Sequence, residues 1–308
     1  MSASQASTGA PAFATDKKRR AYNKPTPLIF HRDGTSTTKR IDHHDQIAYT
    51  TPMRHKHKDK QRSPTDSRRI VIGLHSAREA LKVHPKAVSE IWVKEGAERS
   101  KDLSIFLDFA KKSRVKLFIQ KEGALDRIAT SHQGVCVFMT HTPELDLDSI
   151  AGPEGAPVIL VALDEVSDPH NVGAALRTAW LLGAKGILVP ENRSAHLTPA
   201  AIKVASGGAE HIPLHISGNL ADDLTYLKER GFWTYGLSAD AKGSLFQTRF
   251  NEKVVLVVGA EDKGLRSTTV NVCDELVSIP QTEMGASLNA SVAVALALYE
   301  VVRQHRSP

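Results

Sequence analysis

The fold class is decided by residues 158–177, which read VILVALDEVSDPHNVGAALR. An unbroken apolar run, 158–163, is followed by acidic and turn residues and then by a helical pattern with Val172, Ala175 and Leu176 on one side. A strand that is apolar throughout is typical of a sheet covered on both faces, and residues 254–258, VVLVV, repeat it. We therefore predict an α/β protein with a parallel sheet and expect ligands at the carboxyl ends of its strands.

Two further segments show the same passage from apolar strand to polar loop. Residues 259–265 read GAEDKGL, and residues 279–289 read IPQTEMGASLN. Taken singly, each segment has a simple structural explanation. Asn171 is a suitable N-cap for the first helix, the second segment suits a tight turn, and Ser287 can cap the last helix. Three such junctions with Asn, Arg, Glu and Ser side chains instead favour one shared site.

The remaining pattern divides the chain into parts. The apolar pattern of residues 68–141 predicts a small α/β domain. Its expected strands are 70–72, 90–93, 115–119 and 135–139, and its expected helices are 76–83, 102–112 and 123–130. Residues 142–157, rich in Pro, Gly and acids, predict a linker to a domain spanning 158–308. That domain has further strands predicted at 186–189, 212–215, 233–237 and 275–279. Its last helix is apolar nearly all round, which suits burial within the domain or against a second subunit.

The basic charge of the chain is concentrated in residues 1–67. This segment contains 13 Lys and Arg but 6 Asp and Glu, so 27 basic and 28 acidic residues remain for the rest of the chain. Few aliphatic residues occur in it, so we predict a disordered tail. A basic flexible arm is typical of RNA binding, although a solvated leader is the alternative. The histidines of the tail lack the cysteines or paired carboxylates that would indicate a metal site.

Composition excludes several classes of protein. The 308 residues contain no apolar stretch that could span a bilayer and no signal-peptide core, and Cys136 and Cys273 lie far apart. We expect a cytoplasmic protein without disulfides, metal or membrane contact. No G-x-G-x-x-G is present, which disfavours a nicotinamide oxidoreductase, and the P-loop, His-Glu-x-x-His and Gly-x-Ser-x-Gly motifs are also missing.

Together, the three segments resemble the SpoU (TrmH-type) ribose methyltransferases of the SPOUT superfamily. The family pattern of Asn and Arg after the first strand, Gly-x-Glu-x-x-Gly-Leu, and Ile-Pro before Ser-Leu-Asn matches in order and spacing. Residues 197–209 resemble a further family stretch, and 73–139 resemble the ribosomal-protein-like substrate-binding domain that precedes many members.

The resemblance implies a fold, a reaction and a site. It implies a trefoil-knotted C-terminal domain that methylates a ribose 2′-hydroxyl of RNA with S-adenosyl-L-methionine, without a metal and as a homodimer with sites completed across the interface. Arg177 matches the residue proposed to activate the hydroxyl. Because a guanidinium stays protonated, we expect it to stabilise the alkoxide rather than to act as a base. The polar surroundings match Asn171, Glu261, Ser287 and Asn289, and the cofactor contacts match Gly259, Ile279 and Leu288.

The chain also departs from the family pattern, at Gln281, Glu283, Ala286 and Ala290. These loop positions bear on substrate choice and donor fit more than on reaction class. Two-domain relatives act on large-subunit ribosomal RNA, which favours ribosomal RNA over transfer RNA. The alternatives are a transfer-RNA ribose methyltransferase and a non-catalytic RNA-binding or ribosome-assembly factor that keeps the fold.

Overall fold

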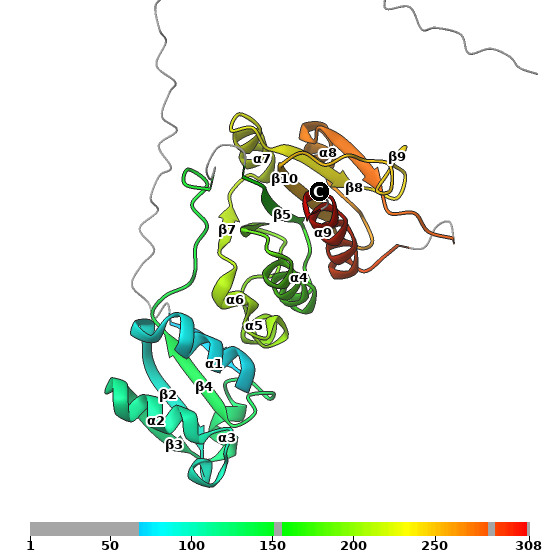
Figure 1. The fold of residues 1–308 in the computed structure, drawn as a ribbon. Coiled ribbons are helices and arrows are strands. Elements are labelled where there is room, and N and C mark those ends of the chain that lie inside the picture. The colour runs from blue at the N-terminus through cyan, green and yellow to red at the C-terminus, as the bar shows by residue number, and fades with distance from the viewer. Residues whose placement is uncertain (1–67, 151–155, 283–286, 307–308) are drawn as a thin grey trace, which may run out of the picture. The chain divides into compact units, whose positions relative to one another are not determined.

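Two sheets organise the described part of the chain, which is residues 68–150, 156–282 and 287–306 of a computed structural model (Figure 1). All of these residues lie in one compact part of the chain, Arg62–Pro308, so the two sheets can be described together. The predicted tail, and the departures at Glu283 and Ala286, lie outside the described residues.

The smaller sheet has the strand order β1-β4-β2-β3. Its strand β4 is buried at every position and runs antiparallel to both neighbours, whereas β2 and β3 are parallel. Two short 3-10 turns, Pro85–Ala87 and Ala97–Arg99, flank β2. The elements are β1 (Arg69–Ile72), α1 (Leu74–Val83), β2 (Val88–Lys94), α2 (Ser104–Ser113), β3 (Lys116–Gln120), α3 (Glu122–Asp126) and β4 (Val135–Met139).

The larger sheet is parallel throughout, with the order β7-β6-β5-β10-β8-β11-β9. Its parallel pairing confirms the expected α/β class, since parallel strands need crossover connections. Helix α4 and the pair α5 and α6 connect neighbouring strands, whereas α7 and α8 carry the chain to strands that are not adjacent. The elements are β5 (Val158–Asp164), α4 (Pro169–Leu182), β6 (Gly186–Pro190), α5 (Pro199–Ala205), α6 (Gly208–His211), β7 (Leu214–Ser217), α7 (Leu220–Lys228), β8 (Trp233–Leu237), β9 (Gly243–Ser244), β10 (Lys253–Gly259), α8 (Ser267–Val272), β11 (Glu275–Ser278) and α9 (Ala290–Arg306).

The central strands of this sheet are covered on both faces, as their apolar sequences predict. All seven residues of β5 are buried. Val161 faces a core shared with α4 and α9, whereas Leu160 faces a second core that includes Leu224 of α7. Burying both faces leaves the carboxyl edge as the place where polar side chains of the sheet gather.

Some predicted boundaries differ from the observed ones. Strands 135–139 and 233–237 are confirmed, but the strand predicted at 212–215 is β7, Leu214–Ser217, because α6 occupies the residues up to His211. Strand β9 was not predicted, since two residues carry no periodic signal. Part of the predicted linker packs on the larger sheet, where Leu145 and Leu147 are buried and Glu144 bridges to Leu214. No helix in the described ranges combines the length and apolarity needed to cross a membrane.

Candidate functional site

The three polar segments converge at the carboxyl edge of the larger sheet. Strands β5 and β10 are neighbours, and Gly259 pairs with Asp164 at their ends. Strand β11 lies in the same sheet, separated from β10 by β8. Each segment leaves its strand at this edge. The edge is therefore where the topology places a ligand site in a sheet of this kind.

One hydrogen-bonded cluster unites the segments. The Asn171 amide donates a short hydrogen bond to the Glu261 carboxylate, and its carbonyl accepts one from the Asn289 amide at 2.9 Å. The same Glu261 oxygen accepts from the backbone N–H of Ala290 at 3.3 Å. Asn171 is only 7% exposed and has little contact with water. Its amide therefore needs hydrogen-bond partners within the protein, and Glu261 and Asn289 provide them. The structure thus brings together three of the predicted site residues, one from each segment.

Asn171 is held by the start of α4. The helix begins at Pro169, and its N-cap is Asp168, whose carboxylate accepts from the backbone N–H of His170 at 2.9 Å. The alternative explanation of Asn171, as the N-cap of this helix, is therefore wrong. Because Asp168 satisfies the helix end, the Asn171 side chain is free to reach Glu261 and Asn289.

The last segment is fixed by Asn289 rather than by Ser287. The Asn289 side chain accepts from the backbone N–H of Ser291 at 2.9 Å, which caps α9, whereas Ser287 is exposed. The alternative explanation of Ser287, as the cap of the last helix, is therefore wrong. Leu288, together with Ile279 at the end of β11, is half-buried and packs on the core shared with α4 and α9.

Gly259 allows the second segment to fold back on its own strand. A Cβ at this position would lie 2.2 Å from the carbonyl carbon of Gly264, so no other residue fits. The turn is closed by a hydrogen bond from the Gly264 N–H to the Ala260 carbonyl at 2.8 Å. This turn presents Glu261 to the cluster and leaves main-chain groups at the sheet edge.

Arg177 lies apart from the cluster. It is exposed on α4, six residues after Asn171 and thus about 9 Å further along the helix axis. Its guanidinium donates a long hydrogen bond to the Ser206 hydroxyl at 3.5 Å, in the turn between α5 and α6. Within this chain, the predicted catalytic arginine and the polar cluster are neighbouring but separate features.

A second polar group at the same edge was not predicted. The buried Asp164 carboxylate accepts from the backbone N–H and Nε of Arg266 at 2.9 and 2.6 Å. Glu165, in the left-handed region with φ of 60°, accepts from Arg193 at 3.2 Å. Both arginines line a cavity of about 540 Å³ beyond the ends of β6 and β7. The position of Arg266 directly after Gly264-Leu265 was the one available signal, since its partner is far away in sequence.

The two cysteines are unsuited to nucleophilic chemistry. Burial raises the pKa of each thiol, Cys136 and Cys273, to about 12. A thiol with such a pKa is almost entirely protonated at neutral pH. Among the described residues, no group of three His, Cys, Asp or Glu side chains is placed to hold a metal ion.

Comparisons with known proteins identify the family. The model of the SpoU rRNA Methylase family matches residues 158–299, and that of the RNA 2′-O ribose methyltransferase substrate binding family matches 70–143. The 23S rRNA (guanosine-2′-O-)-methyltransferase RlmB of Pseudomonas putida is 38% identical over 240 residues, which cover 77% of this chain and 96% of the relative. The chain belongs to the SpoU rRNA methylase family. The same enzyme of Shewanella oneidensis is 38% identical over 243 residues, covering 77% of this chain and 98% of that one.

Solved SpoU structures share the fold. The methyltransferase AviRb from Streptomyces viridochromogenes, in complex with AdoMet, superposes with a TM-score of 0.69 at 24% identity, covering 78% of this chain and 91% of that one. An AdoMet-bound rRNA methyltransferase from Sinorhizobium meliloti gives a TM-score of 0.64 at 22% identity, covering 78% and 88%. These likenesses extend over both sheets and confirm the expected fold class.

Proposed function

We propose that this SpoU family member transfers a methyl group from S-adenosyl-L-methionine to the ribose 2′-hydroxyl of a guanosine in 23S ribosomal RNA. The observation that carries the reaction class is the cluster of Asn171, Glu261 and Asn289, which joins the three family segments into one site. The choice of RNA and nucleotide follows from the relatives. This chain aligns with nearly their whole length, and their names state that activity.

The sheet edge suits the cofactor. An adenosine moiety needs apolar surface and main-chain polar groups, and here the half-buried side chains of Ile279 and Leu288 and the turn after Gly259 provide both kinds. We propose these three residues as its contacts. When bound, S-adenosylmethionine supplies an electrophilic methyl group on a positively charged sulfonium.

The protein must then orient a ribose and stabilise the charge that develops on it. We propose that Arg177, exposed and cationic, neutralises the developing 2′-alkoxide and holds the neighbouring phosphate. Asn171, Glu261 and Asn289 fix the loops around the cofactor, and we propose that Ser287, exposed two residues before Asn289, belongs to the same site.

A concave basic surface on the smaller unit suits the RNA backbone. The smaller unit is the smaller sheet with its helices, residues 68–141, and the larger unit is the larger sheet with its helices. A cavity of about 570 Å³ is lined by Lys86, Arg114 and Lys116, together with hydroxyl and apolar residues and no acidic side chain. Since residues 68–308 carry nearly balanced charge, attraction to phosphate must come from local patches of this kind or from the basic tail. We propose that residues 68–141 form an RNA-binding domain, 142–157 a linker and 158–308 the catalytic domain.

An apolar stripe on α9 supports a homodimer. Val292, Leu296 and Tyr299 recur at helical spacing and are 44, 44 and 62% exposed, while the opposite face of α9 is buried against α4 and the sheet. Leu181 of α4 is 64% exposed. We propose that a second copy covers this stripe and that the chain is trefoil-knotted and cytoplasmic, as the family resemblance implies.

The reaction is tested with purified protein, labelled S-adenosylmethionine and a 23S ribosomal RNA fragment. We expect Arg177→Ala to bind S-adenosylmethionine as the wild type does in calorimetry but to transfer methyl groups roughly 100- to 1,000-fold more slowly. Lys185→Ala, a basic residue at the start of β6 and so at the opposite edge of the sheet, is the matched control.

Three outcomes would count against the proposal. Unchanged turnover in Arg177→Ala would contradict the role given to that residue. Failure of the wild type to bind S-adenosylmethionine would favour a non-catalytic RNA-binding factor. Methylation of transfer RNA, but not of the 23S fragment, would replace the substrate.

A further inference from the structure

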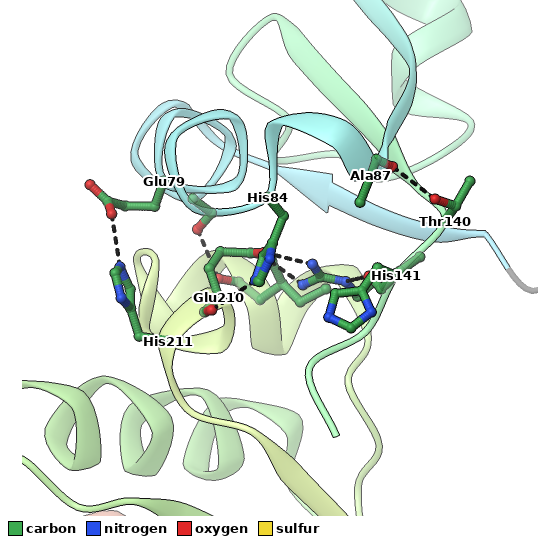
Figure 2. A network of polar contacts seen from close by, with 10 residues as sticks. Glu79, His84, Ala87, Thr140, His141, Glu210 and His211 are labelled. Atoms are coloured by element: carbon green, nitrogen blue, oxygen red, sulfur yellow. Dashed lines mark hydrogen bonds and ion pairs between the residues drawn. The ribbon is translucent and has the colours of Figure 1, made fainter. Parts of the chain in front are cut away.

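A buried ion pair joins the smaller unit to the larger one (Figure 2). The Arg69 guanidinium, on β1, donates to both carboxylate oxygens of Glu210, on α6, at 2.7 and 2.6 Å. Its Nε donates to the carbonyl of His141 at 3.1 Å. The two side chains are 4 and 0% exposed. A bidentate pair of this kind fixes the direction of the contact as well as its strength.

A second contact lies beside the first and leads toward α4. His211, also on α6, forms a hydrogen bond of 2.8 Å with the Glu79 carboxylate on α1. Figure 2 shows the two side chains pointing toward one another. The hydrogen bond from His211 holds the pKa of Glu79 below its usual range. The His211 ring stacks on Trp180, with centroids 4.3 Å apart and planes 7° from parallel. Trp180 lies on α4, three residues after Arg177. We call Arg69, Glu79, Glu210 and His211 the clamp.

The turn before α6 touches both α1 and Arg177. A Cβ on Gly207 would lie 2.7 Å from the Glu79 side chain, and a Cβ on Gly208 would lie 2.9 Å from the Arg177 Cα. Ser206, in the same turn, accepts the hydrogen bond from the Arg177 guanidinium. Because there is no room for side chains here, a shift of α1 would displace the turn that contacts Arg177.

The burial of the ion pair indicates that geometry, rather than stability, is its contribution. Removing two charges from water costs about as much as their attraction returns, so apolar side chains would hold the two surfaces together equally well. Apolar contacts are non-directional, so two apolar surfaces can shift relative to one another. The bidentate pair of Arg69 and Glu210 is directional and permits one arrangement.

We propose that the clamp consists of positioning residues for methyl transfer. It holds the RNA-binding unit at a fixed place relative to the turn that contacts Arg177, so that RNA bound by that unit presents its target ribose in register with the guanidinium. This inference rests on the proposed function, because it assumes that the smaller unit binds the RNA that is methylated.

The test uses the half-buried pair of the clamp, Glu79 and His211, because Glu210→Gln would leave the Arg69 charge buried without a counter-charge. We expect Glu79→Ala to lower kcat for a 23S ribosomal RNA fragment roughly tenfold or more, since small displacements of reacting groups are costly. Affinities for RNA and for S-adenosylmethionine should stay within about twofold of wild type, because Glu79 faces neither proposed binding surface. Glu79→Gln keeps an acceptor for His211 and should recover most of the activity. The control is Asp102→Ala, which breaks the ion pair between Asp102 and Arg78 of α1, inside the smaller unit.

Hydrogen exchange provides a readout that does not depend on activity. Amides of residues 206–211 should exchange faster in Glu79→Ala than in wild type or in Asp102→Ala. Equal kcat in Glu79→Ala and wild type, or no recovery in Glu79→Gln, would overturn the proposal. If the wild type transfers no methyl group, the proposed function fails instead, and unchanged exchange at residues 206–211 would then refute the clamp by itself.

Discussion

At the scale of single residues, Asn171 is the centre of the candidate site. An amide both donates and accepts, so one side chain can bind the Glu261 carboxylate and the Asn289 amide at the same time. A carboxylate at position 171 would only accept. The choice of Asn is therefore explained by its two unlike partners, which come from two different segments of the chain.

This role predicts an order of effects for substitutions at residue 171. Asn171→Ala removes both hydrogen bonds and should lower the free energy of unfolding by about 1–3 kcal/mol. Asn171→Asp should cost more, because it also sets a second negative charge against Glu261. Urea unfolding at neutral pH measures both, with the exposed Asn192→Asp as the control. Equal stability of the Asp and Ala variants would show that the cluster does not act as described.

The same residues show how far sequence reasoning reached. Asn171, Glu261 and Asn289 were predicted as site residues, and the structure joins them. The capping explanations offered for Asn171 and Ser287 were wrong, although Asp168 directly before Pro169 was a readable signal for the true N-cap of α4. At α9 both Ser287 and Asn289 suit a cap, and the choice rests on the contact of Asn289 with Asn171. That contact, like the pairing of Asp164 with Arg266, spans more than 100 residues and leaves no periodic trace.

At the scale of elements, α9 has two apolar faces with different surroundings. Ala293, Ala297 and Val301 are buried against the core, whereas Val292, Leu296 and Tyr299 are exposed. The nearly all-round apolar sequence predicted this, but it could not say which face the domain itself covers. The buried face contains large residues such as Val294 and Leu298 as well as alanines, so residue size alone does not distinguish it from the exposed face.

The exposed stripe predicts the oligomeric state. Leu296→Glu places a charge at the centre of the proposed interface and should shift a dimer toward monomer in sedimentation experiments, because an unpaired buried charge is costly. Ile105→Glu, which changes an equally exposed apolar residue on α2, is the matched control and should leave the mass unchanged. A wild-type protein that sediments as a monomer at all concentrations would refute the homodimer.

At the scale of the whole molecule, the excess of basic residues lies in a different part of the sequence from the site residues. The three segments of the site lie beyond residue 158, while the excess of basic residues lies in 1–67 and the remaining 27 basic and 28 acidic residues nearly cancel. Capture of RNA and methyl transfer are thus assigned to different parts of one chain. Local basic patches, such as the cavity lined by Lys86, Arg114 and Lys116, must supply whatever attraction the tail does not.

The salt dependence of RNA binding measures this division directly. Each phosphate contact that releases counterions adds about −0.7 to −0.9 to the slope of log affinity against log salt concentration. Deleting residues 1–67 should therefore weaken RNA binding and flatten the slope, and replacing Lys86, Arg114 and Lys116 by Gln in the shortened chain should flatten it further. Lys185→Gln is a control outside both regions. If the full-length and shortened proteins show the same slope, the tail makes no contact with phosphate, and the patches on residues 68–308 capture the RNA alone.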